Sequence, residues 1–144
     1  MKQHLHNYNG FSIGIQSPVP QSVVEQANQW MQNNPFFADL QFSSCVIAKV
    51  NDNVVGAIIF AKEQSTIIGG SMQLHMRIQA GFVVPSARRQ GLYKHLHKTV
   101  EAIAKGLGCV DIISRVNAEN TEMLATLDSL GKTIDHYVVV KKLS

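Results

Sequence analysis

The chain has 144 residues, of which 45% are apolar and 16% charged, with a modest net charge of +3. This length suits one domain with a core of its own, and this composition excludes a disordered tail protein. No apolar run reaches the roughly 18 residues that span a bilayer, and the N-terminus lacks the apolar stretch of a secretory signal. We therefore expect a soluble, cytoplasmic protein with a single domain over residues 1–144.

The first half of the chain predicts a strand, a helix and a hairpin. Alternating residues predict a strand over 10–16, and apolar positions at helical spacing predict a helix that begins at Pro20 and ends near residues 33–35. Two strands, 45–50 and 54–61, follow around an Asn-Asp-Asn turn.

The second half alternates strands with helices. Met72, Leu74, Met76, Ile78 and Ala80 alternate with polar residues and predict one long strand over 72–84. Helical spacing then predicts helices over 92–107 and 121–130. Strands are predicted over 110–116 and, as one long or two short pieces, over 133–143.

This order predicts an α/β fold. The three middle strands form an antiparallel meander, whereas the two later strand-helix-strand units favour parallel neighbours. A mixed sheet with helices on both faces satisfies both expectations. Cys45 and Cys109 lie far apart in strand-like contexts, so we interpret them as buried thiols, which suits the cytoplasm.

A cationic patch follows the long strand. Between residues 88 and 105 five basic residues accompany one acid, Glu101. Such a patch fits a solvated helix face as well as it fits an anionic partner, either a phosphate-bearing ligand or a nucleic acid. We disfavour a nucleic-acid partner because the stretch holds one aromatic residue, Tyr93, and no recognition motif.

The turn from Val83 to Tyr93 joins the alternating strand to the amphipathic helix. Free backbone amides converge at a helix start, where the helix dipole also favours an anion. Gly91 has no side chain, so the backbone can approach a bulky anionic group closely. Phosphate or pyrophosphate is therefore the expected occupant.

This turn resembles the diphosphate loop of the GNAT superfamily of N-acetyltransferases. The family's loop has the pattern Arg/Gln-x-x-Gly-x-Gly/Ala, three residues after a proline that ends the fourth strand. Pro85, Arg88 and Gly91 fit this pattern, whereas Tyr93 stands where Gly or Ala is usual.

A second family signature lies downstream. Asn120 stands eleven residues before the glycine of Leu130-Gly131, which closes the next predicted helix, although Lys132 replaces the usual phenylalanine. The element order is similar too, so the resemblance covers nearly the whole chain from Gly10.

The resemblance implies a GNAT-like central mixed, mostly antiparallel sheet with helices on both faces. It implies that acetyl-CoA, or CoA, is held where the fourth and fifth strands splay apart. Backbone groups of Phe82 and Val84 would pair with the pantetheine arm, whether or not their side chains also pack in the core. Asn120 would contact pantetheine or adenosine, or else act as a helix N-cap. The expected cofactor-binding residues are Phe82, Val83, Val84, Arg88, Arg89, Gln90, Gly91, Leu92, Tyr93 and Asn120.

The implied mechanism is direct attack of an amine on the thioester carbonyl, polarised by a backbone amide near Val84. Many relatives use as general acid a tyrosine seven residues after the asparagine, but Leu127 stands there. We take Tyr137 and His75 as the catalytic candidates, with Glu63 as a further one. The alternatives are that Tyr137 is a core aromatic residue, that His75 is a surface histidine, and that solvent protonates the thiolate.

We therefore expect an acetyl-CoA-dependent N-acetyltransferase acting on a primary amine of a small molecule or a protein. The alternative, suggested by Leu127 and Tyr93, is an acyl-CoA-binding module of the same fold with little or no turnover. We expect no membrane or nucleic-acid partner, and a homodimer stays open. We also expect no metal site, because the His4/His6 and His95/His97 pairs are spaced i, i+2.

Overall fold

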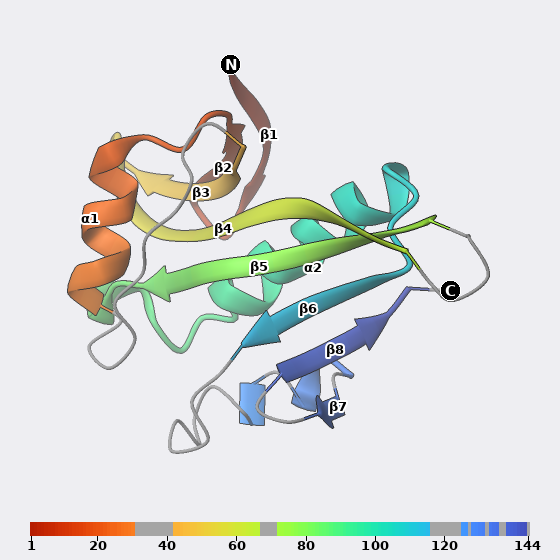
Figure 1. Ribbon diagram of the computed structural model, residues 1–144. Helices are drawn as coiled ribbons and strands as arrows, with labels where there is room; N and C mark the ends of the chain where they lie inside the picture. Colours follow the sequence, from red (N-terminus) through yellow and green to blue (C-terminus); the bar gives the residue numbers. More distant parts are fainter. Residues whose placement is uncertain are drawn as a thin grey trace.

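Eight strands form one sheet in the described part of the chain, in the order β1-β2-β3-β4-β5-β6-β8-β7 (Figure 1). The structure, a computed structural model, describes residues 1–30, 42–66, 72–115, 125–126, 128–131, 133–135 and 138–143. The strands are β1 (Lys2–Tyr8), β2 (Phe11–Gln16), β3 (Ser44–Val50), β4 (Asn53–Thr66), β5 (Met72–Val83), β6 (Asp111–Arg115), β7 (Thr133–Asp135) and β8 (Val138–Lys142).

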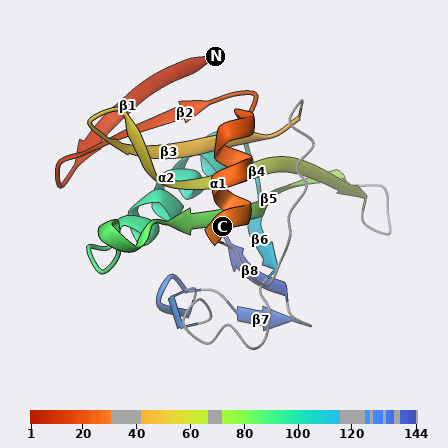
Figure 2. The same ribbon diagram turned by 90° about the vertical axis from the view of Figure 1, so that its left-hand side faces the viewer.

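Two helices cover opposite faces of this sheet, as predicted (Figures 1 and 2). Helix α1 (Gln21–Trp30) packs its buried residues Val23, Val24 and Ala27 on one face. Helix α2 (Leu92–Gly106) packs a longer apolar stripe on the other face, at Leu92, Leu96, Val100 and Ala104. The apolar spacing of each helix thus matches the sheet face that it buries.

The strand directions confirm most of the predicted topology. β3, β4 and β5 form the antiparallel meander, and β6 runs parallel to β5 after the α2 crossover. The second expected parallel neighbour is wrong, because β8 pairs with β6 in the antiparallel direction. The chain end forms two short antiparallel strands, and β8 lies between β6 and β7. The backbone is helical at 125–126 and 128–129, inside the helix predicted over 121–130.

Strand β1 was not predicted. It pairs with β2 at the edge of the sheet, and its sequence, KQHLHNY, contains one large aliphatic residue, Leu5. An edge strand with mostly exposed side chains buries no apolar face, so it carries no alternating signal.

Strand β5 contains a bulge at Gln79. Across β4, Phe60 is opposite Ile78 and Ile59 is opposite Ala80, so one residue of β5 is extra. The bulge reverses the faces: Met76 and Ile78 pack on the α2 side, but Ala80 packs on the α1 side. The alternation predicted through Ala80 therefore holds only up to Ile78.

Both cysteines are free and buried, as predicted. Burial raises the pKa of the Cys45 thiol to about 12 and also raises the pKa of Cys109. None of the helices in the described residues combines the length and the apolar character needed to cross a bilayer.

Candidate active site

The turn after β5 exposes a row of backbone amides. A short 3-10 turn, Pro85–Ala87, uses the amides of Ala87 and Arg88, which donate to the carbonyls of Val84 and Pro85. The first α2 bond is donated by His95 to the Gly91 carbonyl, over 3.0 Å. Among the described residues, no backbone hydrogen bond from the amides of residues 89–94 is found. Within the described residues these six N–H groups therefore have no backbone acceptor, which leaves them as candidates to bind a ligand.

The start of α2 favours an anion at this place. Gly91 is the N-cap residue, with a left-handed φ of 72°, and no side chain caps the helix there. The first turn of α2 contains no acidic residue, so the positive end of the helix dipole is not neutralised locally.

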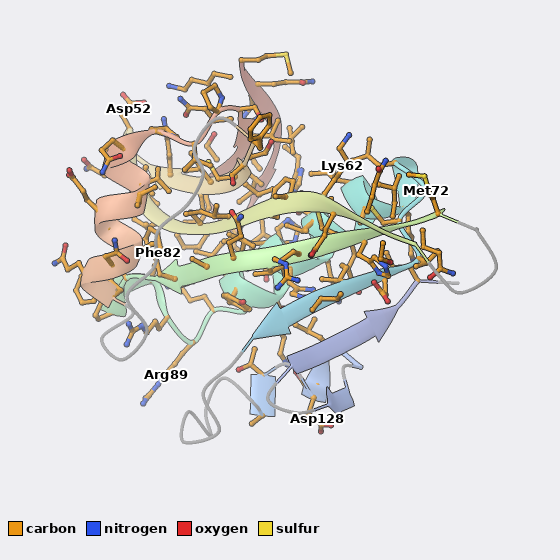
Figure 3. All side chains as sticks on the ribbon, in the orientation of Figure 1. Asp52, Lys62, Met72, Phe82, Arg89 and Asp128 are labelled. Carbon is orange, nitrogen blue, oxygen red and sulfur yellow. The ribbon has the colours of Figure 1, made fainter. Side chains whose placement is uncertain are left out.

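The two arginines of the turn have different roles. Arg88 Nε donates to the Val83 carbonyl over 2.8 Å, and its guanidinium lies 5.9 Å from the ring centre of Trp30. Arg88 thus ties the turn to the end of β5 and to α1. Arg89 has a φ of 64° and its side chain projects outward from the turn (Figure 3).

Strand β5 also has an open edge next to this turn. Its ladder with β6 covers only His75 to Ile78, although β5 continues to Val83. The bulge at Gln79 bends the strand where this ladder ends. Beyond Ile78 the backbone facing β6 therefore has no strand partner in the described residues.

Hydrogen bonds to β4 settle which backbone groups face the open edge. The Val84 amide donates to the Val55 carbonyl over 2.9 Å, so it points toward β4. Groups of Phe82, two residues earlier, share that direction, because orientation alternates along an antiparallel ladder. The groups at the open edge are those of Gly81 and Val83, whose carbonyl already accepts from Arg88. The backbone groups expected at this edge were those of Phe82 and Val84. The groups that face it belong to the residues one position earlier, Gly81 and Val83.

The side chains of this segment belong to the core on both faces. Phe82 is buried in the α1 cluster, and Val83 and Leu92 are buried in the α2 cluster. Tyr93 lies directly beneath Gly81: a Cβ at residue 81 would lie 2.9 Å from Tyr93 Cε2. Burial raises the pKa of the Tyr93 phenol to about 12.

Polar side chains gather on the face of β5 that is opposite α2, nearer the start of the strand. Asp111 Oδ1 and His75 Nδ1 are 2.5 Å apart, and Ser65 Oγ and His75 Nε2 are also 2.5 Å apart. A carboxylate can only accept, so Nδ1 carries the hydrogen and the neutral imidazole accepts from Ser65. This chain of contacts fixes the orientation and tautomer of His75.

A second polar pair lies beside His75. Arg77 Nε donates to Glu63 Oε2 over 2.6 Å, and both side chains are partly exposed. His75 itself lies three residues before Ile78, about 10 Å along the strand from the place where the β5-β6 ladder ends.

A family profile decides how this geometry is interpreted. The profile of the acetyltransferase (GNAT) family matches residues 14–131. The chain belongs to the GNAT acetyltransferase family.

Solved structures support the GNAT fold. Arabidopsis thaliana NAA60 in complex with acetyl-CoA is 12% identical with a TM-score of 0.72, over 91% of this chain and 98% of that one. The aminoglycoside N-acetyltransferase AAC(6')-Iy in complex with CoA is 20% identical with a TM-score of 0.63, over 85% and 89%. A putative GNAT acetyltransferase from Desulfovibrio desulfuricans is 12% identical with a TM-score of 0.67, over 92% and 99%. No curated protein sequence matches the chain.

These comparisons confirm the predicted GNAT fold, and the cofactor predicted here is the one that the first two structures contain. The structure brings together the predicted loop residues Arg88 to Tyr93 at the open edge of β5. Three residues important for the predicted mechanism, Asn120, Leu127 and Tyr137, lie outside the described residues.

Sequence reasoning missed several contacts of the candidate site residues. Ser65 and Asp111 contact His75 across three strands, and Gly81 receives Tyr93. The register places Glu63, not Ser65, directly opposite His75, so no local signal in the sequence could have paired Ser65 with His75. In the part of the chain that the structure describes, no three His, Cys, Asp or Glu side chains cluster as metal ligands.

Proposed function

We propose that this protein transfers the acetyl group of acetyl-CoA to a primary amine. The observation that carries the proposal is the row of unbonded amides at residues 89–94 beside the open edge of β5. A diphosphate matches the amides and the helix dipole, and an extended pantetheine arm matches a strand edge. Membership of the GNAT acetyltransferase family supports the same donor.

In this proposal the donor lies along the turn and then along β5. The diphosphate accepts from the amides of residues 89–94, and pantetheine pairs with backbone groups of Gly81 and Val83. An N–H group of this edge then polarises the thioester carbonyl, because it lies where negative charge develops on the oxygen.

The acceptor amine attacks the carbonyl carbon directly. The C–N bond forms, the C–S bond breaks, and CoA leaves as the thiolate, while the amine loses a proton. We assign His75 as the base, because Asp111 orients its imidazole; since it lies about 10 Å from the end of the β5-β6 ladder, it receives the proton through intervening water. Glu63 is the second candidate base, and Tyr137 stays our candidate for the acid that protonates the thiolate.

The acceptor class is a primary amine on a small molecule or on a protein. Two of the similar structures are those of an aminoglycoside N-acetyltransferase and of NAA60. An amine panel should therefore contain aminoglycosides, polyamines, lysine and peptide N-termini, with release of free CoA thiol as the readout. Turnover of one class names the acceptor.

Calorimetry with CoA tests the donor site. Replacing Gly91 by Glu places a carboxylate and a side chain in the turn, so we expect CoA binding to be lost. The same substitution at Gly106, at the other end of α2, meets no atom within 4 Å and should leave CoA affinity unchanged. Unchanged affinity of the folded Gly91→Glu protein would refute the loop assignment.

A CoA-binding module without turnover is the second candidate. The observation that favours it is Tyr93. This residue stands where the family pattern has Gly or Ala, and its ring fills the space under Gly81. CoA binding without thiol release for any amine would select this alternative. Absence of CoA binding by the folded wild-type protein would overturn both candidates.

A further inference from the structure

Strand β1 lies outside the residues that the family profile matches, yet it contacts the proposed diphosphate turn. Tyr8, its last residue, donates its hydroxyl hydrogen to the Gln90 carbonyl over 3.2 Å. Its ring stacks on the His95 ring, with centres 3.9 Å apart and planes within 14°. The end of β1 therefore contacts both the residues before α2 and the first helical turn of α2.

A histidine pair adds a second contact between the same two elements. His6 Nε2 and His95 Nε2 are 2.6 Å apart, and the rings meet edge to face. Two ring nitrogens can share a hydrogen only while at least one ring is neutral. The groups that face His95 are His6 and Tyr8 from β1 and Lys98 from its own helix. Burial, His6 and Lys98 together lower the pKa of His95.

The turn that β1 contacts has an energetically unfavourable backbone conformation. Arg89 and Gly91 have positive φ angles of 64° and 72°, and Gln90 stands between them. A non-glycine residue in this region costs conformational energy, so the turn needs support from its surroundings. Tyr8 gives that support, since its hydroxyl binds the Gln90 carbonyl and lies 3.1 Å from where a Gly91 Cβ would be.

We propose that Tyr8 and the His6–His95 pair are positioning residues that hold residues 89–91 in the conformation that binds the CoA diphosphate. The proposal rests on the proposed function for the identity of the ligand. It makes β1 part of the donor site without any contact to the donor. Acidification weakens the arrangement, because the hydrogen bond between the two Nε2 atoms exists only while at least one ring is neutral.

The test compares Tyr8→Phe with His4→Ala. Tyr8→Phe keeps the ring that stacks on His95 and removes only the hydroxyl. His4→Ala changes the same strand at a residue whose ring contacts Ser12. We expect Tyr8→Phe to weaken CoA binding about three- to tenfold, as the loss of one hydrogen bond predicts, and His4→Ala to leave it unchanged.

A pH series tests the histidine pair. CoA affinity of the wild type should fall as the pH drops from 7.5 to 5.5, because the ordered arrangement lowers the pKa of His95 and keeps it neutral, whereas a displaced β1 lets it take a proton. His6→Gln should flatten this fall, since ionisation of the ligand is the same for both proteins. An identical pH dependence in the two proteins would overturn the role of the pair.

Amide hydrogen exchange of the ligand-free protein separates this inference from the proposed function. Tyr8→Phe should speed exchange at residues 89–94 relative to His4→Ala, whether or not CoA binds. Equal exchange in the two variants would overturn the inference. Failure of the wild type to bind CoA would instead overturn the proposed function.

Discussion

His75 is held from both sides of its ring by residues on neighbouring strands. Asp111 on β6 accepts from Nδ1, and Ser65 on β4 lies against Nε2. In the proposed role the ring takes the proton of the amine at Nε2, while Nδ1 stays bonded to Asp111 and the exposed Ser65 hydroxyl turns to accept a hydrogen. The three residues therefore suit a base more than an isolated surface histidine would.

Replacing His75 by Gln tests that role. We expect turnover to fall about 10²- to 10⁴-fold, the usual contribution of a general base, with CoA affinity unchanged because the donor site is elsewhere. Asp111→Asn should give a smaller loss, since it changes the charge and the hydrogen bond at Nδ1 but leaves the imidazole in place. Rates measured from pH 6 to 9 provide the readout.

Glu63→Gln is the matched control for His75, since the two residues are cross-strand neighbours. Turnover that survives His75→Gln but is lost in Glu63→Gln would transfer the role of base to Glu63.

The residues of the turn could be predicted, and those around His75 could not. Unbonded amides at 89–94 follow from a strand, a glycine and a helix start in one short segment. Ser65 and Asp111 meet His75 through the pairing of three strands, which local pattern does not specify. The expectation of Phe82 and Val84 at the open edge failed for a related reason: the Val84 amide binds Val55.

Strand β5 and helix α2 approach each other closely because a small residue faces a large one. Gly81 of β5 leaves room for the Tyr93 ring of α2, which stands where the family pattern has Gly or Ala. The departure at Tyr93 is thus matched by the absence of a side chain across the interface.

Gly81→Ala should therefore destabilise the fold, by about 1–3 kcal/mol as expected for overpacking. Tyr93→Ala should cost stability through a cavity, but the double variant should cost less than the sum of the two. Urea unfolding measures all three.

Gly106→Ala is the control for that cycle, because a Cβ there meets nothing within 4 Å and Ala favours a helix. A Gly81→Ala protein as stable as the wild type, or strictly additive effects, would contradict the contact.

The elements that the sequence predicted best are those with a buried face. The apolar stripe of α2 and the β3-β4-β5 meander are confirmed, because the apolar residues of these elements are spaced so that they all face the core. Strand β1 has no such face, and the direction of β8 depends on a hairpin rather than a helix crossover. Both errors concern pairing at or near a sheet edge, where burial imposes little on the sequence.

At the scale of the whole molecule, each face of the sheet buries a group that must stay protonated. The Cys45 thiol packs in the core on the α1 side, and the Tyr93 ring of α2 packs against the core on the other face. Burial raises the pKa of each to about 12, from ordinary values of 9.0 and 10.0. The native state therefore holds both protons at pH values where the unfolded chain releases them.

Stability should consequently fall in alkali. Each group contributes fully below its ordinary pKa, and its contribution is lost between about pH 9 and 12 for Cys45 and between about pH 10 and 12 for Tyr93. The free energy of unfolding should decrease by up to about 1.4 kcal/mol per pH unit for each group. Urea titrations from pH 8 to 11, under reducing conditions, measure the slope.

Cys45→Ala should reduce that slope from pH 9, and Tyr93→Phe should reduce it from pH 10. Slopes that match the wild type in both variants would show that other groups cause the alkaline loss.

The extra residue at Gln79 has a consequence for changes in chain length. Removing one residue there would restore a regular ladder between β4 and β5. Ile78 would stay opposite Phe60 and Ala80 opposite Ile59, so the side chains would keep their faces, but the bend that the bulge gives to β5 would be lost. A single-residue deletion, far smaller than any loop change, would thus let β5 run straight beside β6 beyond Ile78 and close the strand edge against a donor.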